Sequence, residues 1–211
     1  MHQIDHWIQF FDWDFFNLFD RSVVLRELIT KIRQYIQPPA NVIEVGCGSG
    51  WSAILLSSMG YKVTAIDAHP DLINSLKKFE TVLDDLSFQC MDMFHLEFDR
   101  AKFELAFSQG VLEHYSDSEI IAALREQKRV AMVIVIDVPN ARGKIGDYGD
   151  ERVITPGHWR QLIQSAGLEI VAESTRGMAR WSQINLKLLG WLEDSWLSRR
   201  FGENSIFVTH S

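Results

Sequence analysis

The stretch that decides the fold is VIEVGCGSGWS, which runs from Val42 to Ser52. A β-branched run leads directly into three glycines, Gly46, Gly48 and Gly50, and an apolar helical pattern follows. Glycine permits positive φ and lets the backbone approach a ligand where a Cβ atom would collide with it. The unpaired N–H groups at the start of the helix suit a carboxylate or a phosphate. The stretch therefore predicts a strand, a ligand-binding turn and a helix.

Strand and helix patterns alternate from this stretch onward. Such alternation implies right-handed βαβ crossovers and a mostly parallel sheet. The strand patterns are continuous apolar runs, as expected when both faces of a sheet are covered. The expected strands are Asn41–Val45, Tyr61–Asp67, Ser87–Cys90, Phe103–Ser108, Val130–Asp137, Leu168–Glu173 and Ser205–His210. The expected helices between them are Trp51–Met59, Asp71–Phe79 and Asp117–Gln127.

Two segments lie outside this alternation. Residues 1–37 precede the first strand, and the dense aromatic run Trp7–Phe19 within them has much apolar surface to bury. Residues 176–200 carry apolar side chains at helical spacing before the last strand. We expect one domain over residues 1–211 that comprises an aromatic helical cap (1–37), a cofactor-binding core (38–175), a helical lid insertion (176–200) and a last strand (201–211).

Composition limits the functional classes that are open to the chain. With 211 residues, 46% of them hydrophobic, and a net charge of −7, it suits one globular domain and lacks the positive charge that grips nucleic acid or an anionic membrane. No apolar run approaches the roughly 20 residues of a membrane-spanning helix, and no secretory signal opens the chain. Cys47 and Cys90 make no disulfide framework, and Cys90 reads as a buried strand residue. We expect a cytoplasmic monomer or homodimer whose partner is a small molecule.

Acidic residues lie at or near the carboxyl ends of three of the expected strands. Glu44 lies two residues before Gly46, where it can orient an ammonium group or cap local N–H groups. Asp67 ends the next strand, where its carboxylate can accept hydrogen bonds from both hydroxyls of a ribose or N-cap the following helix. Asp92 follows the third strand, where it can reach an adenine amino group, with Met93 against the ring, or order a turn.

Four motifs in order resemble those of the class I S-adenosylmethionine-dependent methyltransferases: VIEVGCGSG, VTAIDAHP, CMDM and FELAFSQGVLEHY. The later stretch ERVITPGHWRQLIQSAGLEIVAES is similar to the family's late helix and sixth strand, with Gly167 closing the helix. The resemblance implies an α/β fold with a Rossmann-like, mostly parallel sheet in the order 3-2-1-4-5-7-6 and helices on both faces. It implies S-adenosyl-L-methionine as the cofactor and S-adenosyl-L-homocysteine as the product.

The resemblance also assigns parts of the cofactor to parts of the chain. The glycine loop would hold the methionine part, Asp67 the ribose and Asp92 the adenine, while the turn at residues 108–110 would lie beside the transferring methyl group. The expected cofactor-binding residues are Glu44, Gly46, Cys47, Gly48, Gly50, Asp67, Ala68, Asp92, Met93, Ser108, Gln109 and Gly110.

Methyl transfer from a sulfonium is an in-line displacement, in which a protein positions, desolvates and sometimes deprotonates the acceptor. His114 is the candidate general base, because histidine can deprotonate a hydroxyl or an amine near neutral pH; alternatively it orders its loop. Quinone-biosynthesis O-methyltransferases have a similar E-x-x-E-H turn that can hold Mg²⁺, but Gly110 replaces its first acid here, and we expect no metal. The expected acceptor pocket comprises Phe11, Trp13, Tyr115, Asn140, Tyr148 and Trp181.

These features favour a methyltransferase (EC 2.1.1.-) that acts on an oxygen, nitrogen or carbon atom of a small, largely apolar or aromatic molecule. One alternative keeps the fold and the cofactor but lacks transfer activity or uses the pocket for another reaction. A nicotinamide-dependent oxidoreductase is disfavoured, because Trp51 stands where a dinucleotide-binding fold has its last glycine.

Overall fold

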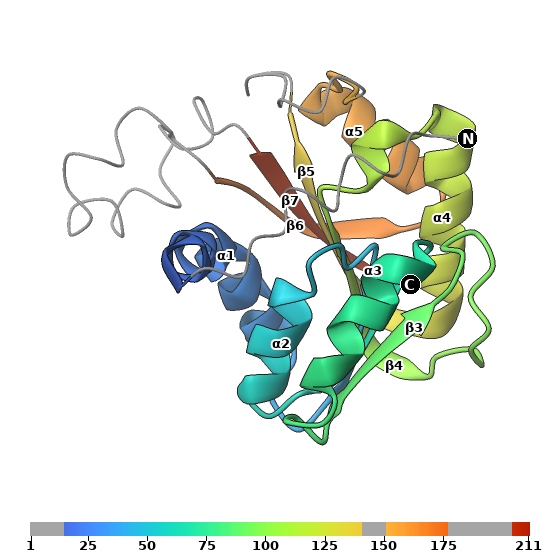
Figure 1. The fold of residues 1–211 in the computed structure, drawn as a ribbon. Helices are drawn as coiled ribbons and strands as arrows, with labels where there is room; N and C mark the ends of the chain where they lie inside the picture. The colour runs from blue at the N-terminus through green and yellow to red at the C-terminus, as the bar shows by residue number, and fades with distance from the viewer. Residues whose placement is uncertain (1–14, 141–150, 177–203) are drawn as a thin grey trace, which may run out of the picture.

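The sheet has the strand order that the resemblance to class I methyltransferases implies. The computed structural model describes residues 15–140, 151–176 and 204–211, and its seven-stranded sheet runs in the order β3-β2-β1-β4-β5-β7-β6 (Figure 1). Strands β1 to β5 are parallel, and β7 is antiparallel to both β5 and β6. The strands are β1 Asn41–Val45, β2 Lys62–Asp67, β3 Leu86–Cys90, β4 Phe103–Gln109, β5 Ala131–Pro139, β6 Glu169–Arg176 and β7 Asn204–His210.

Helices cover both faces of this sheet, as predicted. Alternate strand residues point into two separate apolar clusters, one beneath α1, α2 and α3 and the other beneath α4 and α5 (Figure 1). The helices are α1 Phe15–Tyr35, α2 Trp51–Ser58, α3 Pro70–Leu76, α4 Asp117–Val130 and α5 Pro156–Ser165, with the 3₁₀ turns η3 Lys77–Phe79 and η4 Leu112–His114.

The predicted N-terminal cap is helical in its described part. In α1 the side chains of Leu28 and Ile32 are fully buried, and the helix contacts α2 and β5. The predicted helical insertion before the last strand falls almost entirely on residues 177–203, which lie outside the described part of the chain.

Several predicted boundaries shift for identifiable reasons. Val130 ends α4 instead of beginning a strand, because the N–H of Ala131 still donates to the carbonyl oxygen of Gln127. Tyr61 precedes β2, and its hydroxyl donates to the carbonyl oxygen of Ile36 at 3.0 Å, which ties the strand to the segment after α1.

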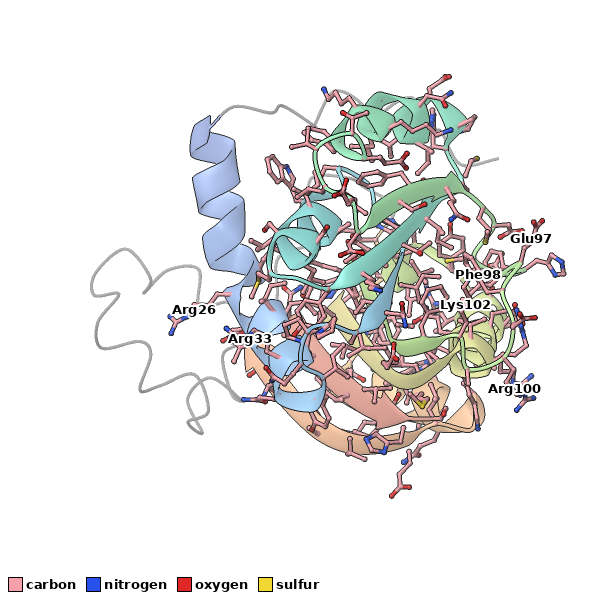
Figure 2. All side chains as sticks on the ribbon, turned by 90° about the horizontal axis from the view of Figure 1, so that it is seen from below. Arg26, Arg33, Glu97, Phe98, Arg100 and Lys102 are labelled. Carbon is pink, nitrogen blue, oxygen red and sulfur yellow. The ribbon has the colours of Figure 1, made fainter. Side chains whose placement is uncertain are left out.

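The expectation that Cys90 is buried is wrong. Its thiol is exposed, whereas that of Cys47 is buried. Cys90 is the last residue of β3, and within the described residues β3 pairs only with β2, so it forms an edge of the sheet. The loop that follows is held by contacts with other parts of the chain: the Arg129 guanidinium donates to the carbonyl oxygens of Leu96 and Phe98, and the Lys102 ammonium lies 4.6 Å from the centroid of the Phe98 ring (Figure 2).

Candidate functional site

The residues predicted to bind a ligand come together at the carboxyl ends of the parallel strands. The glycine loop follows β1, Asp67 ends β2, and Gln109 ends β4, which lies beside β1 on its other side. Open α/β sheets bind ligands at this edge, where the strand order reverses between neighbours. In this sheet the reversal lies between β1 and β4.

The glycine loop has the backbone conformation that the sequence predicts. Gly46, Gly48 and Gly50 have φ angles of 75°, 49° and 71°, a region that favours glycine. The N–H groups of Gly46 and Cys47 donate to the carbonyl oxygen of Ile66 at 2.9 and 2.8 Å, which anchors the loop to β2. A Cβ atom at Gly50 would lie 2.8 Å from the Phe88 ring, so the loop also has no room for a side chain there.

Asp67 joins the glycine loop to the turn after β2. Its Oδ2 atom accepts a hydrogen bond from the N–H of Gly48 at 3.0 Å, and Oδ1 accepts one from the N–H of His69 at 3.1 Å. The alternative role of Asp67 as an N-cap is wrong, because the N-cap of α3 is His69, whose Nδ1 atom accepts from the N–H of Leu72. Asp67 is only partly buried, and the next residue, Ala68, is exposed.

Glu44 is a carboxyl group with an unusual surrounding. It is 3% exposed, and the backbone of Ala53 and the side chain of Ser52 favour its charged form, the effect expected if Glu44 caps local groups. Its Oε2 atom has no hydrogen-bond partner among the described residues. Burial first, and then the negative charge of Asp67, raise the pKa of the Glu44 carboxyl well above its ordinary value.

Glu44→Gln is expected to stabilise the cofactor-free protein at pH 7 by about 1–3 kcal/mol, the usual scale for a buried polar group that lacks full compensation. A carboxyl group whose pKa is raised by folding favours the folded state at low pH. That contribution is lost as the pH rises from the ordinary value of 4.5 through the higher pKa of the folded state. Thermal unfolding between about pH 5 and pH 8 should therefore show a wild-type Tm that declines more than that of the variant.

Glu97→Gln is the matched control for this measurement, because Glu97 is an exposed carboxylate on the loop after β3 (Figure 2). It should leave the pH dependence of Tm as it is in the wild type. A Glu44→Gln variant with the wild-type pH dependence would show that burial of this carboxyl group does not oppose its ionisation.

A row of polar side chains continues from Glu44 across the sheet. The Ser52 hydroxyl donates to Oε1 of Gln109 at 3.3 Å, and Nε2 of Gln109 donates to Oδ2 of Asp137 at 3.1 Å. Nδ2 of Asn204, the first residue of β7, donates to Oδ1 of the fully buried Asp137 at 3.4 Å. The candidate residue Gln109 is therefore held at the centre of a network that joins α2, β4, β5 and β7.

Sequence reasoning found only part of this network. Gln109 was predicted to bind the cofactor, whereas the sequence did not reveal the contact of Asn204 with Asp137. No local signal marks Asn204, because its contact with Asp137 depends on the register of β7 against β5. Beside the network, Ser108 is 1% exposed, and its hydroxyl has no hydrogen-bond partner among the described residues.

The residues predicted to contact adenine lie in a turn after β3. Asp92 is exposed, and its Oδ1 atom accepts from the N–H of Phe94 at 2.9 Å, so it orders the turn. Met93 is 7% exposed and packs in the core. The turn role of Asp92 is thus observed, and contact with an adenine stays a prediction.

The predicted catalytic and acceptor residues are only partly described. His114 ends η4, the short turn after β4, and Tyr115 follows it. Asn140 is 4% exposed, and its Nδ2 atom donates to the Ser205 hydroxyl at 3.2 Å, so it binds β7. The remaining predicted pocket residues, Phe11, Trp13, Tyr148 and Trp181, lie outside the described residues.

The described ranges contain neither a cluster of metal-ligating side chains nor a helix suited to spanning a membrane. Within residues 15–140, 151–176 and 204–211, no three histidine, cysteine, aspartate or glutamate side chains gather as metal ligands would. Over the same ranges, no helix has both the length and the apolar character that crossing a membrane requires.

Comparisons with known proteins agree with this geometry. Residues 42–132 match the model of a methyltransferase domain. The chain is 28% identical over 129 residues to the human eEF1A lysine and N-terminal methyltransferase, a match that covers 60% of this chain and 18% of that protein. It is 28% identical over 145 residues to the uncharacterized methyltransferase YodH of Bacillus subtilis, covering 63% of this chain and 61% of YodH. The matched segments therefore span less than two thirds of either relative.

Solved structures share the fold at low sequence identity. A SAM-dependent methyltransferase from Aquifex aeolicus has a TM-score of 0.66 and 18% identity, and the match covers 97% of this chain and 96% of that one. The (4+2)-cyclase SpnF has a TM-score of 0.66 and 16% identity, covering 88% of this chain and 80% of that one. Residues 42–132 thus match a methyltransferase domain, and the described sheet has the Rossmann-like fold of the class I methyltransferases.

S-adenosylmethionine is the cofactor that this class implies, and the residues at the strand ends fit it. The loop glycines hold positive φ, so their backbone can approach a ligand without interference from Cβ atoms. The buried Glu44 carboxyl group has one oxygen that is not bonded to a described residue, as expected of a group that receives an ammonium. Asp67 stands at the end of β2, one strand away, at the position suited to a ribose.

Proposed function

We propose that this protein is an S-adenosylmethionine-dependent methyltransferase that transfers a methyl group to an oxygen, nitrogen or carbon atom of a small, largely apolar or aromatic molecule. The observation that carries the proposal is the pairing of the glycine loop with Asp67, whose carboxylate bonds the N–H of Gly48. This hydrogen bond joins the loop, which would hold the methionine part of the cofactor, to the acid at the end of β2, which would hold the ribose. The cofactor, when bound, supplies a methyl group on a positively charged sulfur.

In this proposal each part of the strand edge binds one part of the cofactor. The glycine loop holds the methionine part, and the free oxygen of Glu44 receives its ammonium group. One carboxylate oxygen of Asp67 turns from the N–H of Gly48 to the ribose hydroxyls. The exposed carboxylate of Asp92 accepts a hydrogen bond from the adenine amino group. Gln109, fixed by Ser52 and Asp137, presents the turn at residues 108–110 to the reacting atoms.

His114 acts as the general base. The residue stands on η4, directly after the strand whose end carries Gln109, so it lies at the same edge as the glycine loop. A ring nitrogen of His114 takes the proton from a hydroxyl or amine acceptor, which would leave the acceptor a lone pair for the methyl group that the cofactor would supply. The bound cofactor would supply the methyl group, and the protein's share of the work would be to align the acceptor with it and to exclude water.

An apolar or aromatic acceptor is favoured by the residues that precede β1. The segment 1–19 carries a dense run of tryptophan and phenylalanine, more than one core stripe needs. A protein acceptor is the competing possibility, because the human relative is named as an eEF1A lysine and N-terminal methyltransferase.

A second candidate function is a reaction other than methyl transfer on the same fold. It is favoured by one finding, the similarity of fold to the cyclase SpnF. In that case the cofactor site would be retained, and no S-adenosylhomocysteine would form.

A product assay separates these functions. The protein is incubated with S-adenosylmethionine and a panel of phenols, aromatic amines, and peptides with free lysine or N-terminal amines. S-adenosylhomocysteine and a mass gain of about 14 daltons, the replacement of H by CH₃, are then measured in each mixture. We expect both signals with a phenol or an aromatic amine. Signals with the peptides alone would refute the small-molecule acceptor, and cofactor binding without either signal would favour the second candidate function.

A further inference from the structure

One arginine, distant in sequence, holds the turn that carries His114. Arg152 donates from Nη1 to the carbonyl oxygen of Tyr115 at 2.5 Å, although 37 residues separate them in the sequence. Its backbone N–H donates to the carbonyl oxygen of Glu113 at 3.0 Å. Arg152 therefore binds the carbonyl groups on both sides of His114.

The same guanidinium is anchored at the start of α4. Nη2 of Arg152 donates to Oδ1 of Asp117 at 2.6 Å, and Nε2 of His158 lies 2.8 Å from Oδ2 of the same carboxylate. The bond from Arg152, followed by that from His158, holds the pKa of the Asp117 carboxyl below its ordinary value. Asp117 thus stays an anion that fixes Arg152, and through it the turn.

The opposite side of the turn is fixed by an aromatic contact. The ring of Tyr115 lies edge-on to that of Phe94, with the ring centroids 5.4 Å apart. Phe94 belongs to the turn that Asp92 orders, through the hydrogen bond to its N–H. The residue after His114 is therefore held between the predicted adenine turn and Arg152.

These contacts contribute geometry more than stability. The Arg152 and Asp117 side chains are 38% and 44% exposed, and ion pairs at such exposure contribute at most about 1 kcal/mol. The turn itself is a single 3₁₀ turn of three residues, and such turns have poor internal hydrogen-bond geometry. Without outside bonds it would be free to shift, and a displacement of about 1 Å at a reacting group can slow a reaction about 10²-fold.

We propose that Arg152 is a positioning residue for methyl transfer, because its bonds to the carbonyl groups of Glu113 and Tyr115 hold His114 in the place where the acceptor is deprotonated. The inference rests on the proposed role of His114. A guanidinium suits this task because its planar fork can donate to a carbonyl and a carboxylate at once, whereas the ammonium of lysine lacks that fixed geometry.

Arg152→Gln is expected to lower kcat about tenfold or more and to leave the Kd for S-adenosylhomocysteine within about twofold. The acceptor in this assay is the phenol or aromatic amine of the panel that gives the fastest turnover. Guanidinium chloride should restore part of the lost activity in Arg152→Gln, and Arg152→Lys should be intermediate. Arg160→Gln is the matched control, because Arg160 forms a comparably exposed pair with Glu173 that does not involve the turn, and its kcat should be unchanged.

A double-mutant cycle with His114→Ala tests whether the loss of kcat in Arg152→Gln depends on His114. If Arg152 acts through His114, then Arg152→Gln has little further effect on kcat once His114 is replaced. The rate of amide hydrogen exchange can be measured without a methyl acceptor. It should increase at residues 112–115 in Arg152→Gln and not in Arg160→Gln.

Three results would overturn the positioning role: a full additional loss of kcat in the His114→Ala background, a loss confined to the Kd of the cofactor, or unchanged exchange at residues 112–115. Failure of the proposed function has a different signature. In that case the wild-type protein forms no S-adenosylhomocysteine with any acceptor, or His114→Ala keeps full activity, and the positioning role falls with it.

Discussion

His114→Ala is expected to lower turnover by about 10²–10⁴-fold, the usual contribution of a positioned general base. Cofactor affinity should remain within about twofold, because the residues assigned to the cofactor lie on the glycine loop, at the ends of β2 and β4 and in the turn after β3, and none of them lies on η4. Steady-state kinetics with the fastest acceptor of the panel, together with calorimetry using S-adenosylhomocysteine, measure the two quantities separately.

Two further variants distinguish a general base from a residue that only orders the turn. His114→Asn can form hydrogen bonds but cannot act as a base near neutral pH, so recovery of activity in it would assign His114 to ordering the turn. His95→Ala is the matched control, because His95 is an exposed histidine on the loop after β3, and it should turn over at the wild-type rate. Full activity in His114→Ala would remove His114 from the mechanism altogether.

Asp67→Ala is expected to weaken S-adenosylhomocysteine binding by about 2–4 kcal/mol, or roughly 30- to 900-fold in Kd. Two bonds to the ribose hydroxyls would be lost, each of the strength typical of hydrogen bonds to a charged group. The N–H of Gly48 would also lose its acceptor, so the glycine loop would be less well ordered before the cofactor arrives. Calorimetry on the folded variant measures the change.

Asp71→Ala removes the same charge four residues away, in the first turn of α3, and serves as the control. It should bind S-adenosylhomocysteine as the wild type does. Equal affinity in Asp67→Ala and the wild type would exclude Asp67 from the cofactor site. A loss of the same size in Asp71→Ala would mean that overall charge, rather than the position of Asp67, governs binding.

Local sequence predicted the parts of this molecule that local backbone chemistry controls. The three loop glycines all have positive φ, and Gly167, predicted to close a helix, has a φ of 82° after α5. The sheet order was implied by resemblance, since strand patterns alone do not say which strands are neighbours. The predicted ends of strands and helices are less accurate, because a residue such as Val130 suits either state and a single capping bond decides between them.

The features that sequence reasoning missed all depend on long-range contacts. Asn204 reaches Asp137 only because β7 pairs with β5 in one register. The bonds of Arg152 to the turn after β4 join residues that are far apart in the sequence, so no local pattern predicts them. The exposure of Cys90 follows from the position of β3 at the edge of the sheet, which its own apolar pattern does not reveal.

The Ser52 hydroxyl can donate only one hydrogen bond, and two acceptors can compete for it. One is Oε1 of Gln109, and the other is the Glu44 carboxyl group, whose charged form Ser52 favours. When Glu44 carries its own proton, it can donate to Ser52, and the serine proton is available to Gln109. When Glu44 is ionised, as it would be beside an ammonium, it competes for the Ser52 hydroxyl proton. The side-chain Oε1 atom of Gln109 then loses its hydrogen-bond donor. A positive charge that binds beside Glu44 on β1 would thus change the hydrogen bonding of the Gln109 side-chain amide at the end of β4. The change requires only that one hydrogen bond of Ser52 reverse. An empty site and a filled one would then present different hydrogen-bonding patterns to the acceptor.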